Sequence, residues 1–217
     1  MTFSTMLAQL GAGMLKSMGI FFWTVVLSLP LGLFVSFGRM SKNSVIRNIV
    51  KIYISVMRGT PLMLQLMIVY YSPFLLFGMN IRTFRFPAII IGFTINYAAY
   101  FAEIFRSGIM SIDEGQMEAG RSLGFNYVQT MRYIIMPQAF KNVLPALCNE
   151  FVVLLKETSV AGYVAVQDLT KGGDIIRSRT YDAWTPLLIV AAVYLALTMI
   201  FNHFAQNLER SLRKNER

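Results

Sequence analysis

The polar side chains that could do chemistry lie inside long apolar stretches of the sequence. Glu150 and Glu157 are seven residues apart at the end of one such stretch, so a helix would place both on one face. A carboxylate in apolar surroundings is costly unless a cation or a hydrogen-bond donor accompanies it. The cation is either part of a substrate or the neighbouring Lys156. Both interpretations remain open from the sequence.

A second polar face precedes this one in the chain. Asn96, Tyr100 and Glu103 recur at i, i+4 and i+7, so a helix would align them. Such a face is expected to point away from lipid, toward other helices or a water-filled path. Asn96 is equally suited to contact a substrate or to form an interhelical hydrogen bond. Glu103 and Arg106 are spaced for a structural ion pair.

No enzymatic or metal chemistry can be assembled from these residues. His203 has no cysteine or carboxylate at a metal-ligand spacing, and no nucleophile motif is present. The sequence also lacks the glycine-rich loop G-x-x-x-x-G-K-[ST] that holds nucleotide phosphates. We therefore predict that the chain is not an enzyme, carries no cofactor and does not hydrolyse ATP itself. Cys148 is its sole cysteine, which excludes an intrachain disulfide.

Composition predicts which elements position these side chains. The 217 residues are 55% hydrophobic and only 14% charged, with a mean hydropathy of +0.53, whereas soluble domains carry about 25% charged residues. A membrane-spanning helix needs roughly 20 apolar residues. Five segments qualify, near 18–38, 52–77, 86–105, 138–157 and 186–206. The predicted fold is an all-α integral membrane protein with one domain over 1–217.

The second segment carries signals for an interruption. Thr60 followed by Pro61 is typical of a helix N-cap with proline at the first helical position. An amphipathic piece precedes it, with apolar residues at Ile46, Ile49, Val50, Tyr53 and Met57. We therefore expect a broken helix here. Pro30 and Pro145 are expected to kink other spans.

Basic residues are distributed unevenly between the two ends of the predicted spans. Twelve fall on one side: Arg39, Lys42, Arg47, Lys51, Arg106, Arg121, Arg132, Lys141, Arg210, Arg213, Lys214 and Arg217. The other side has Lys16, Arg82, Arg85, Lys171, Arg177 and Arg179. The positive-inside rule then predicts a multi-pass protein of the cytoplasmic membrane, with the amino terminus outside and the carboxyl terminus in the cytoplasm.

The same rule places the loop 107–137 in the cytoplasm. Within it, residues 116–123 can form about two helical turns, and Gly124 suits the left-handed position that ends a helix. Ala119 and Gly120 are small enough to let another protein approach closely. Glu118 and Arg121 could pair with that protein or with each other. An ordinary interfacial helix with an internal ion pair is the alternative.

The residues from Glu118 to Pro137 resemble a family signature, E-A-A-x-x-x-G-x9-I-x-L-P. The spacing agrees throughout, and the departures are Gly120 for alanine and Met136 for leucine. The signature is typical of permease subunits of bacterial ATP-binding cassette importers. The stretch Arg58-Gly59-Thr60-Pro61 with Gln65 is similar to one in permeases for polar amino acids, as is the stretch from Asn149 to Thr158.

This resemblance implies a type I importer-like fold, with a short cytoplasmic coupling helix containing Glu118, Ala119, Gly120, Arg121 and Gly124. It implies a second permease subunit, identical or related, an ATPase dimer that binds ATP and magnesium, and an extracytoplasmic solute-binding protein. A polar amino acid would cross by alternating access. Substrate-binding candidates are Asn96, Tyr100, Glu150, Glu157 and Thr158.

Two alternatives concern the whole chain and one of its loops. A self-sufficient carrier or channel driven by an ion gradient would use the intramembrane glutamates as ion sites, although no inverted repeat supports it. Residues 166–180 are polar yet compatible with a helix. They are expected to form either a short extracytoplasmic helix that a delivery protein touches or a plain solvated loop.

Overall fold

The computed structural model describes residues 2–78, 80, 83–164 and 166–214, and no strand occurs in these ranges. The all-helical prediction is confirmed. Three described helices are long and apolar enough to cross a membrane. They are α1 (Phe3–Arg39), α4 (Arg85–Met110) and α9 (Thr185–Lys214).

The segment predicted at 52–77 is broken into two helices, as its sequence indicated. α2 (Ser44–Gly59) and α3 (Leu62–Phe77) are bent by 109° at the intervening Thr60 and Pro61. Pro61 cannot continue the backbone hydrogen-bond ladder of α2, which explains where the helix ends. Taken together, the pair would make a fourth apolar segment.

The fifth predicted segment is α7 (Met136–Glu157), which is helical but less apolar. It does not count among the apolar spans of the described chain because polar side chains interrupt it, notably Asn142, Asn149 and Glu150. Length and composition thus support membrane crossing at four of the five predicted segments. That α7 also crosses the membrane stays a prediction.

α1 begins at Phe3, fifteen residues before the predicted start at 18. This additional part of the helix packs on α8 (Leu169–Thr180), where Leu10 joins Leu169, Ile176 and Val190 in a small apolar cluster. The hydropathy pattern of a single segment does not contain this tertiary contact.

The main core forms between α1 and α4. Small or hydroxylated residues recur along the buried face of α1: Gly13, Ser17, Thr24, Ser28, Gly32 and Ser36. At Gly32 an added Cβ would lie 2.8 Å from the Phe101 Cβ, so the two backbones approach closely, as small residues allow in membrane proteins. α3, α7 and the 3₁₀ helix η2 (Thr158–Val164) complete the core.

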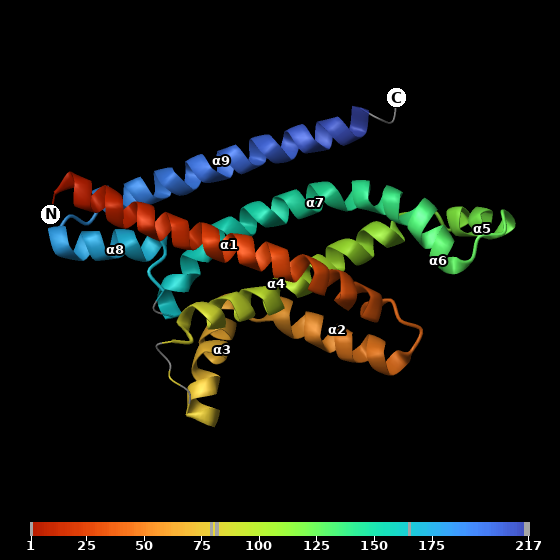
Figure 1. Ribbon diagram of the computed structural model, residues 1–217, viewed down its shortest axis with the longest axis horizontal. Coiled ribbons are helices and arrows are strands. Elements are labelled where there is room, and N and C mark those ends of the chain that lie inside the picture. The colour runs from red at the N-terminus through yellow and green to blue at the C-terminus, as the bar shows by residue number, and fades with distance from the viewer. Residues whose placement is uncertain (1, 79, 81–82, 165, 215–217) are drawn as a thin grey trace.

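The elements divide between the two ends of the long axis (Figure 1). The N-terminus and α8 lie at one end. The turn from α1 to α2, the short helix α5 (Glu114–Ser122) and the last part of α9 lie toward the other. This arrangement agrees with the two sets of basic residues predicted from the sequence, except that Arg82 and Arg217 lie outside the described residues.

Candidate functional site

Helix α5 has well-defined ends on both sides. Asp113 caps its N-terminus, where its Oδ1 accepts a hydrogen bond of 2.6 Å from the Gly115 N–H. At the other end, the N–H groups of Gly124 and Phe125 donate to the carbonyls of Arg121 and Gly120. This is the Schellman arrangement, and Gly124 adopts the left-handed conformation with φ of +83°. The prediction for the conformation of Gly124 is confirmed, although the helix begins two residues earlier than expected.

The position of Gly120 corrects one expectation. Gly120 is buried and faces its own chain, because an added Cβ would lie 2.5 Å from the Thr130 Cγ2 and 3.2 Å from the Ile134 Cδ1. It therefore does not present a small surface to a partner. Ala119 is exposed and remains available for that contact.

The pairing of Glu118 with Arg121, one of the two alternatives for these residues, is absent. Both side chains are exposed, and within the described residues no ion pair joins them. They line a pocket of about 400 Å³ together with residues of α4, α6 (Tyr127–Thr130) and the turns between. The alternative of an internally paired interfacial helix is thus wrong for this pair, and both charges are free to meet another surface.

A continuous helical arm connects α5 to the membrane domain. α6 starts with a reciprocal capping box between Asn126 and Gln129. It runs through a π-helical turn, η1 (Met131–Ile135), directly into α7. The arm and α5 project from one end of the molecule (Figure 1). Because Gly120 is packed against this arm, a force applied to α5 would be transmitted to α7.

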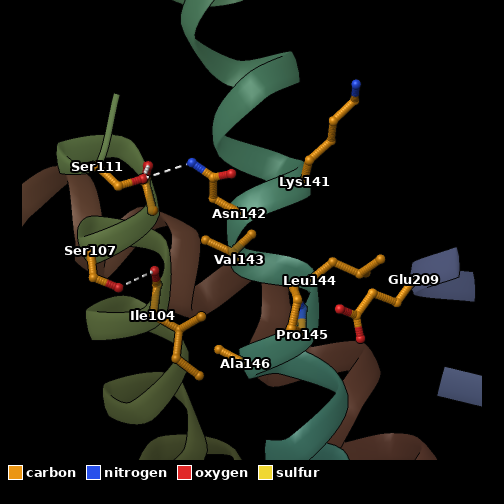
Figure 2. Close-up of a pocket in the computed structure, with 11 residues that line it drawn as sticks. Ile104, Ser107, Ser111, Lys141, Asn142, Val143, Leu144, Pro145, Ala146 and Glu209 are labelled. Carbon is orange, nitrogen blue, oxygen red and sulfur yellow. Dashed lines mark hydrogen bonds between the residues drawn. The ribbon is translucent and has the colours of Figure 1, made fainter. Parts of the chain in front are cut away.

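Where the arm continues into α7, it contacts the end of α4. A pocket of about 480 Å³ lies between these helices. The Asn142 amide donates to the Ser111 hydroxyl at 2.9 Å across it (Figure 2). Glu209 enters the same pocket from α9. Three helices therefore converge where the arm enters the membrane domain, a feature that the sequence did not reveal.

A second group of polar residues gathers deeper in the molecule, from three helices. Tyr97 of α4 donates a hydrogen bond of 2.6 Å to Glu157 of α7. The Arg58 guanidinium, at the end of α2, lies 5.2 Å from the centre of the Tyr100 ring, a cation–π distance. The rings of Tyr97 and Tyr100 are 5.8 Å apart. We call Arg58, Tyr97, Tyr100, Glu150 and Glu157 the polar cluster.

The glutamates of this cluster have not paired with Lys156. That lysine is exposed, and within the described chain it makes no ion pair, so the internal pairing alternative is not observed. Glu150 and Glu157 both remain partly exposed and lie within electrostatic range of each other. Two carboxylates and one guanidinium thus give the cluster a formal charge of −1 when all are ionised.

Thr158 is not placed to contact a ligand. Its side chain is 0% exposed, and its hydroxyl donates to the Leu155 carbonyl at 2.8 Å. It closes the end of α7, and this corrects its inclusion among the substrate-binding candidates.

Two roles were predicted for Asn96, a substrate contact or an interhelical hydrogen bond, and the structure shows the hydrogen bond. The side chain is 2% exposed and donates to Gln65 Oε1 at 2.9 Å and to the Met57 carbonyl at 3.1 Å. Gln65 in turn donates to the Met57 carbonyl and to Thr60. These amides satisfy carbonyl groups that the end of α2 leaves without helical partners.

Glu103 forms the predicted structural ion pair with Arg106, at 2.7 Å. Arg39 at the end of α1 approaches the other oxygen at 3.7 Å. Sequence reasoning missed Tyr97 and Arg58 as site residues. The signals were present, since Arg58 lies in the R-G-T-P stretch and Tyr97 is next to Asn96.

The segment 166–180 contains a helix, α8, and is not a plain loop. Asp168 is 0% exposed and caps α8 by accepting from the N–H groups of Thr170 and Lys171, while its burial raises its pKa. On the outer face, hydrogen bonds from Lys171 and Arg177 hold the pKa of Asp174 below its usual value. This ionic face is available to a partner.

Comparisons with known proteins agree with this geometry. Residues 28–214 match the family described as "Binding-protein-dependent transport system inner membrane component". The arginine transport system permease protein ArtQ of Bacillus subtilis is 37% identical over 193 residues, covering 89% of this chain and 87% of that protein.

Two solved structures share the fold. A crystal structure of an amino acid ABC transporter with histidines is 40% identical with a TM-score of 0.88, covering 97% of this chain and 99% of that one. The MetNI methionine ABC transporter in an inward-facing conformation has a TM-score of 0.78 at 19% identity, covering 98% and 99%; this likeness concerns the fold alone. The chain therefore belongs to the binding-protein-dependent transport system inner membrane component family, the ABC importer permease subunits that its motifs predicted.

Proposed function

We propose that this chain is the membrane-spanning subunit of an ATP-driven importer for a polar amino acid. In this proposal α5 docks on a cytoplasmic ATPase subunit, which binds ATP and magnesium. Closure of the ATPase dimer moves α5, and the arm transmits the movement to α7 as a near rigid-body rotation. The site is then exposed alternately to the two sides of the membrane.

The observation that carries the proposal is the mechanical connection from α5 to the polar cluster. Gly120 fixes α5 to the arm, the arm continues as α7, and α7 carries Glu150 and Glu157 at its far end. A force-transmitting helix and a set of charged groups thus belong to one continuous element. A self-sufficient carrier would have no need for an exposed, capped helix on such an arm.

The substrate class follows from the chemistry of the cluster. An amino acid carries an ammonium and a carboxylate group. Glu150 and Glu157 are complements for the ammonium, and Arg58 is a complement for the carboxylate. This class is supported by a relative named for arginine transport and by the crystal structure described as an amino acid ABC transporter with histidines.

The remaining partners follow from the same architecture. Few helices are available to enclose a pathway, so a second copy or a related subunit is expected to complete it. α8, at the end opposite to α5 (Figure 1), presents its ionic face to an extracytoplasmic solute-binding protein. The amino terminus would lie on the same side as α8, and the carboxyl terminus in the cytoplasm.

Reconstitution tests this proposal against the ion-coupled alternative. The chain is placed in proteoliposomes with its ATPase and solute-binding protein, and uptake of a panel of radiolabelled amino acids is measured with and without ATP. We expect uptake that requires ATP and all components. Uptake by the chain alone, driven by a proton or sodium gradient, would contradict the proposal.

A further inference from the structure

Helix α2 presents three different faces. One packs against α4, where Val50, Tyr53, Ile54 and Met57 meet Ala99 and Ala102. A second is apolar and exposed, and it consists of Val45, Ile49, Ile52 and Val56. The third is polar. At 100° per residue, Arg47, Lys51 and Arg58 fall within about 40° of one another around the helix axis. Ser55 borders this face about 40° from Lys51, and Asn48 lies about 20° beyond it, toward the apolar face.

This polar face, which we call the α2 stripe, lies alongside the middle of a membrane span. The Tyr53 hydroxyl donates to the Ile95 carbonyl at 2.5 Å, and Asn96 donates to the Met57 carbonyl. Both α4 residues are near the centre of α4 (Arg85–Met110), a largely buried helix that is long and apolar enough to cross a membrane. The second half of α2 is therefore at the depth of the span and does not lie along a membrane surface.

The stripe is nevertheless open. Asn48, Lys51, Ser55 and Arg58 are exposed and Arg47 is partly exposed. Within the described chain neither Arg47 nor Lys51 makes an ion pair. Charged side chains at this depth are expected to face a water-filled cavity, because lipid would solvate them poorly. The adjoining apolar face of α2 provides a separate surface for lipid or another subunit.

We propose that the α2 stripe lines the cytoplasmic half of the translocation pathway and conducts the carboxylate group of the substrate out of the polar cluster. Arg58 stands at the cluster, Lys51 is about 10 Å further along the helix and Arg47 a further 6 Å or so. The stripe therefore leads from the glutamates toward the end of the molecule where α1 turns into α2. This role rests on the importer function proposed above.

The arrangement has a physical rationale. A zwitterion held by Glu150 and Glu157 must leave two carboxylates that attract its ammonium group. Successive cations offer its carboxylate a series of weak sites, and conduction requires sites weak and numerous enough for the ligand to leave. Since a hydrated path screens each charge, no single cation of the stripe needs to bind tightly.

Thiol labelling of the assembled complex tests the proposal. In a Cys148→Ser background, Ser55→Cys and Asn48→Cys probe the stripe, and Ile49→Cys and Val56→Cys are matched controls on the apolar face. Inside-out vesicles are treated with an anionic sulfonatoethyl and a cationic trimethylammonium methanethiosulfonate reagent. We expect both stripe positions to react and the controls to remain unlabelled.

Charge and conformation supply further readouts. After correction for intrinsic reactivity, the anionic reagent should be favoured at position 55 by about fivefold, as expected for a unit charge roughly 8 Å away in water. Lys51→Gln should reduce this preference, whereas Lys42→Gln, outside α2, should not. Trapping with ATP and vanadate should protect position 55 by closing the cytoplasmic half.

Several results would overturn the proposal. The cysteine of Ser55→Cys could be unreactive, it could react without a charge preference, or its labelling could be unchanged by ATP and vanadate. Each of these results would place α2 at the membrane surface. ATP hydrolysis and uptake are measured on the same preparation. A complex that is active but shows any of these results refutes the role of the stripe alone, whereas a preparation without ATP-dependent uptake refutes the importer function.

Discussion

Gly120 and Thr130 are in such close contact that a Cβ at position 120 would lie 2.5 Å from the Thr130 Cγ2. This contact joins α5 to the arm that continues as α7. It also accounts for the glycine found where the family signature has alanine. The glycine that replaces alanine in the signature thus leaves room for the side chain of Thr130.

The first prediction concerns this contact. Gly120→Ala should overpack the junction, which costs about 1–3 kcal/mol, partly offset by roughly 1 kcal/mol of gained helix propensity. Coupling between substrate and ATP hydrolysis should weaken, and Thr130→Ala should restore it in the double variant. Gly11→Ala is the control, because open space surrounds that position. A double-mutant cycle with no interaction free energy between 120 and 130 would refute this account.

The second prediction concerns the end of α5. Gly124 has φ of +83°, and left-handed backbone costs an L-residue about 1–2 kcal/mol. Gly124→Val should therefore abolish substrate-stimulated ATP hydrolysis while the subunit still inserts and assembles. Gly124→Asn should retain much of the activity, since asparagine tolerates this conformation. Glu118→Lys should impair coupling to a lesser degree. Normal transport by an assembled Gly124→Val complex would show that the loop does not dock as proposed.

The third prediction concerns the polar cluster. If Glu150 or Glu157 binds the ammonium group of the substrate, changing that residue to Gln should remove a charge-assisted hydrogen bond of about 1.5–3 kcal/mol. The affinity should then fall roughly 10- to 150-fold. Calorimetric titration and thermal unfolding are measured together on both variants and on Tyr97→Phe, which breaks the hydrogen bond to Glu157.

Lys156→Met is the matched control for the third prediction, because Lys156 is exposed. It should leave both affinity and melting temperature close to those of the unchanged protein. Lower stability with unchanged affinity in both glutamate variants would exclude this cluster from the substrate site.

The fourth prediction concerns topology. The distribution of basic residues places Asn80 and Asp174 outside the cell and Ser41 and Glu114 in the cytoplasm. Single cysteines are introduced at these positions in a Cys148→Ser background. An impermeant thiol reagent added to intact cells should label the cysteines at 80 and 174 but not those at 41 and 114. Labelling of position 41 or 114 by an impermeant reagent added outside would reverse the orientation and remove α5 from the ATPase.

Local signals in the sequence predicted local structure well. The end of α5 at Gly124, the ion pair of Glu103 with Arg106 and the interruption at Pro61 depend on neighbouring residues and their spacing. Hydropathy also located the apolar helices, because membrane burial acts on whole segments.

Features that depend on residues distant in sequence were not predicted. The inward orientation of Gly120 depends on Thr130. An interhelical hydrogen bond was one of the alternatives for Asn96, but its partner Gln65 in another helix was not predicted. Similarly, the early start of α1 depends on its packing against α8. The spacing of residues within one segment does not indicate which helices will pack together. The polar cluster was predicted in part. Tyr100 and the two glutamates were named from the sequence, whereas Arg58, which comes from α2, and Tyr97 were not.

The central claim is that α5 docks on an ATPase subunit, and site-specific photocrosslinking measures this directly. A benzoylphenylalanine at position 118, on the exposed face of α5, is activated in cells that also express the ATPase. The same group at position 174 of α8 is the control. We predict a crosslink to the ATPase from position 118 and none from 174. An ATPase crosslink from 174, or none from 118 in a complex that hydrolyses ATP in response to substrate, would contradict the account.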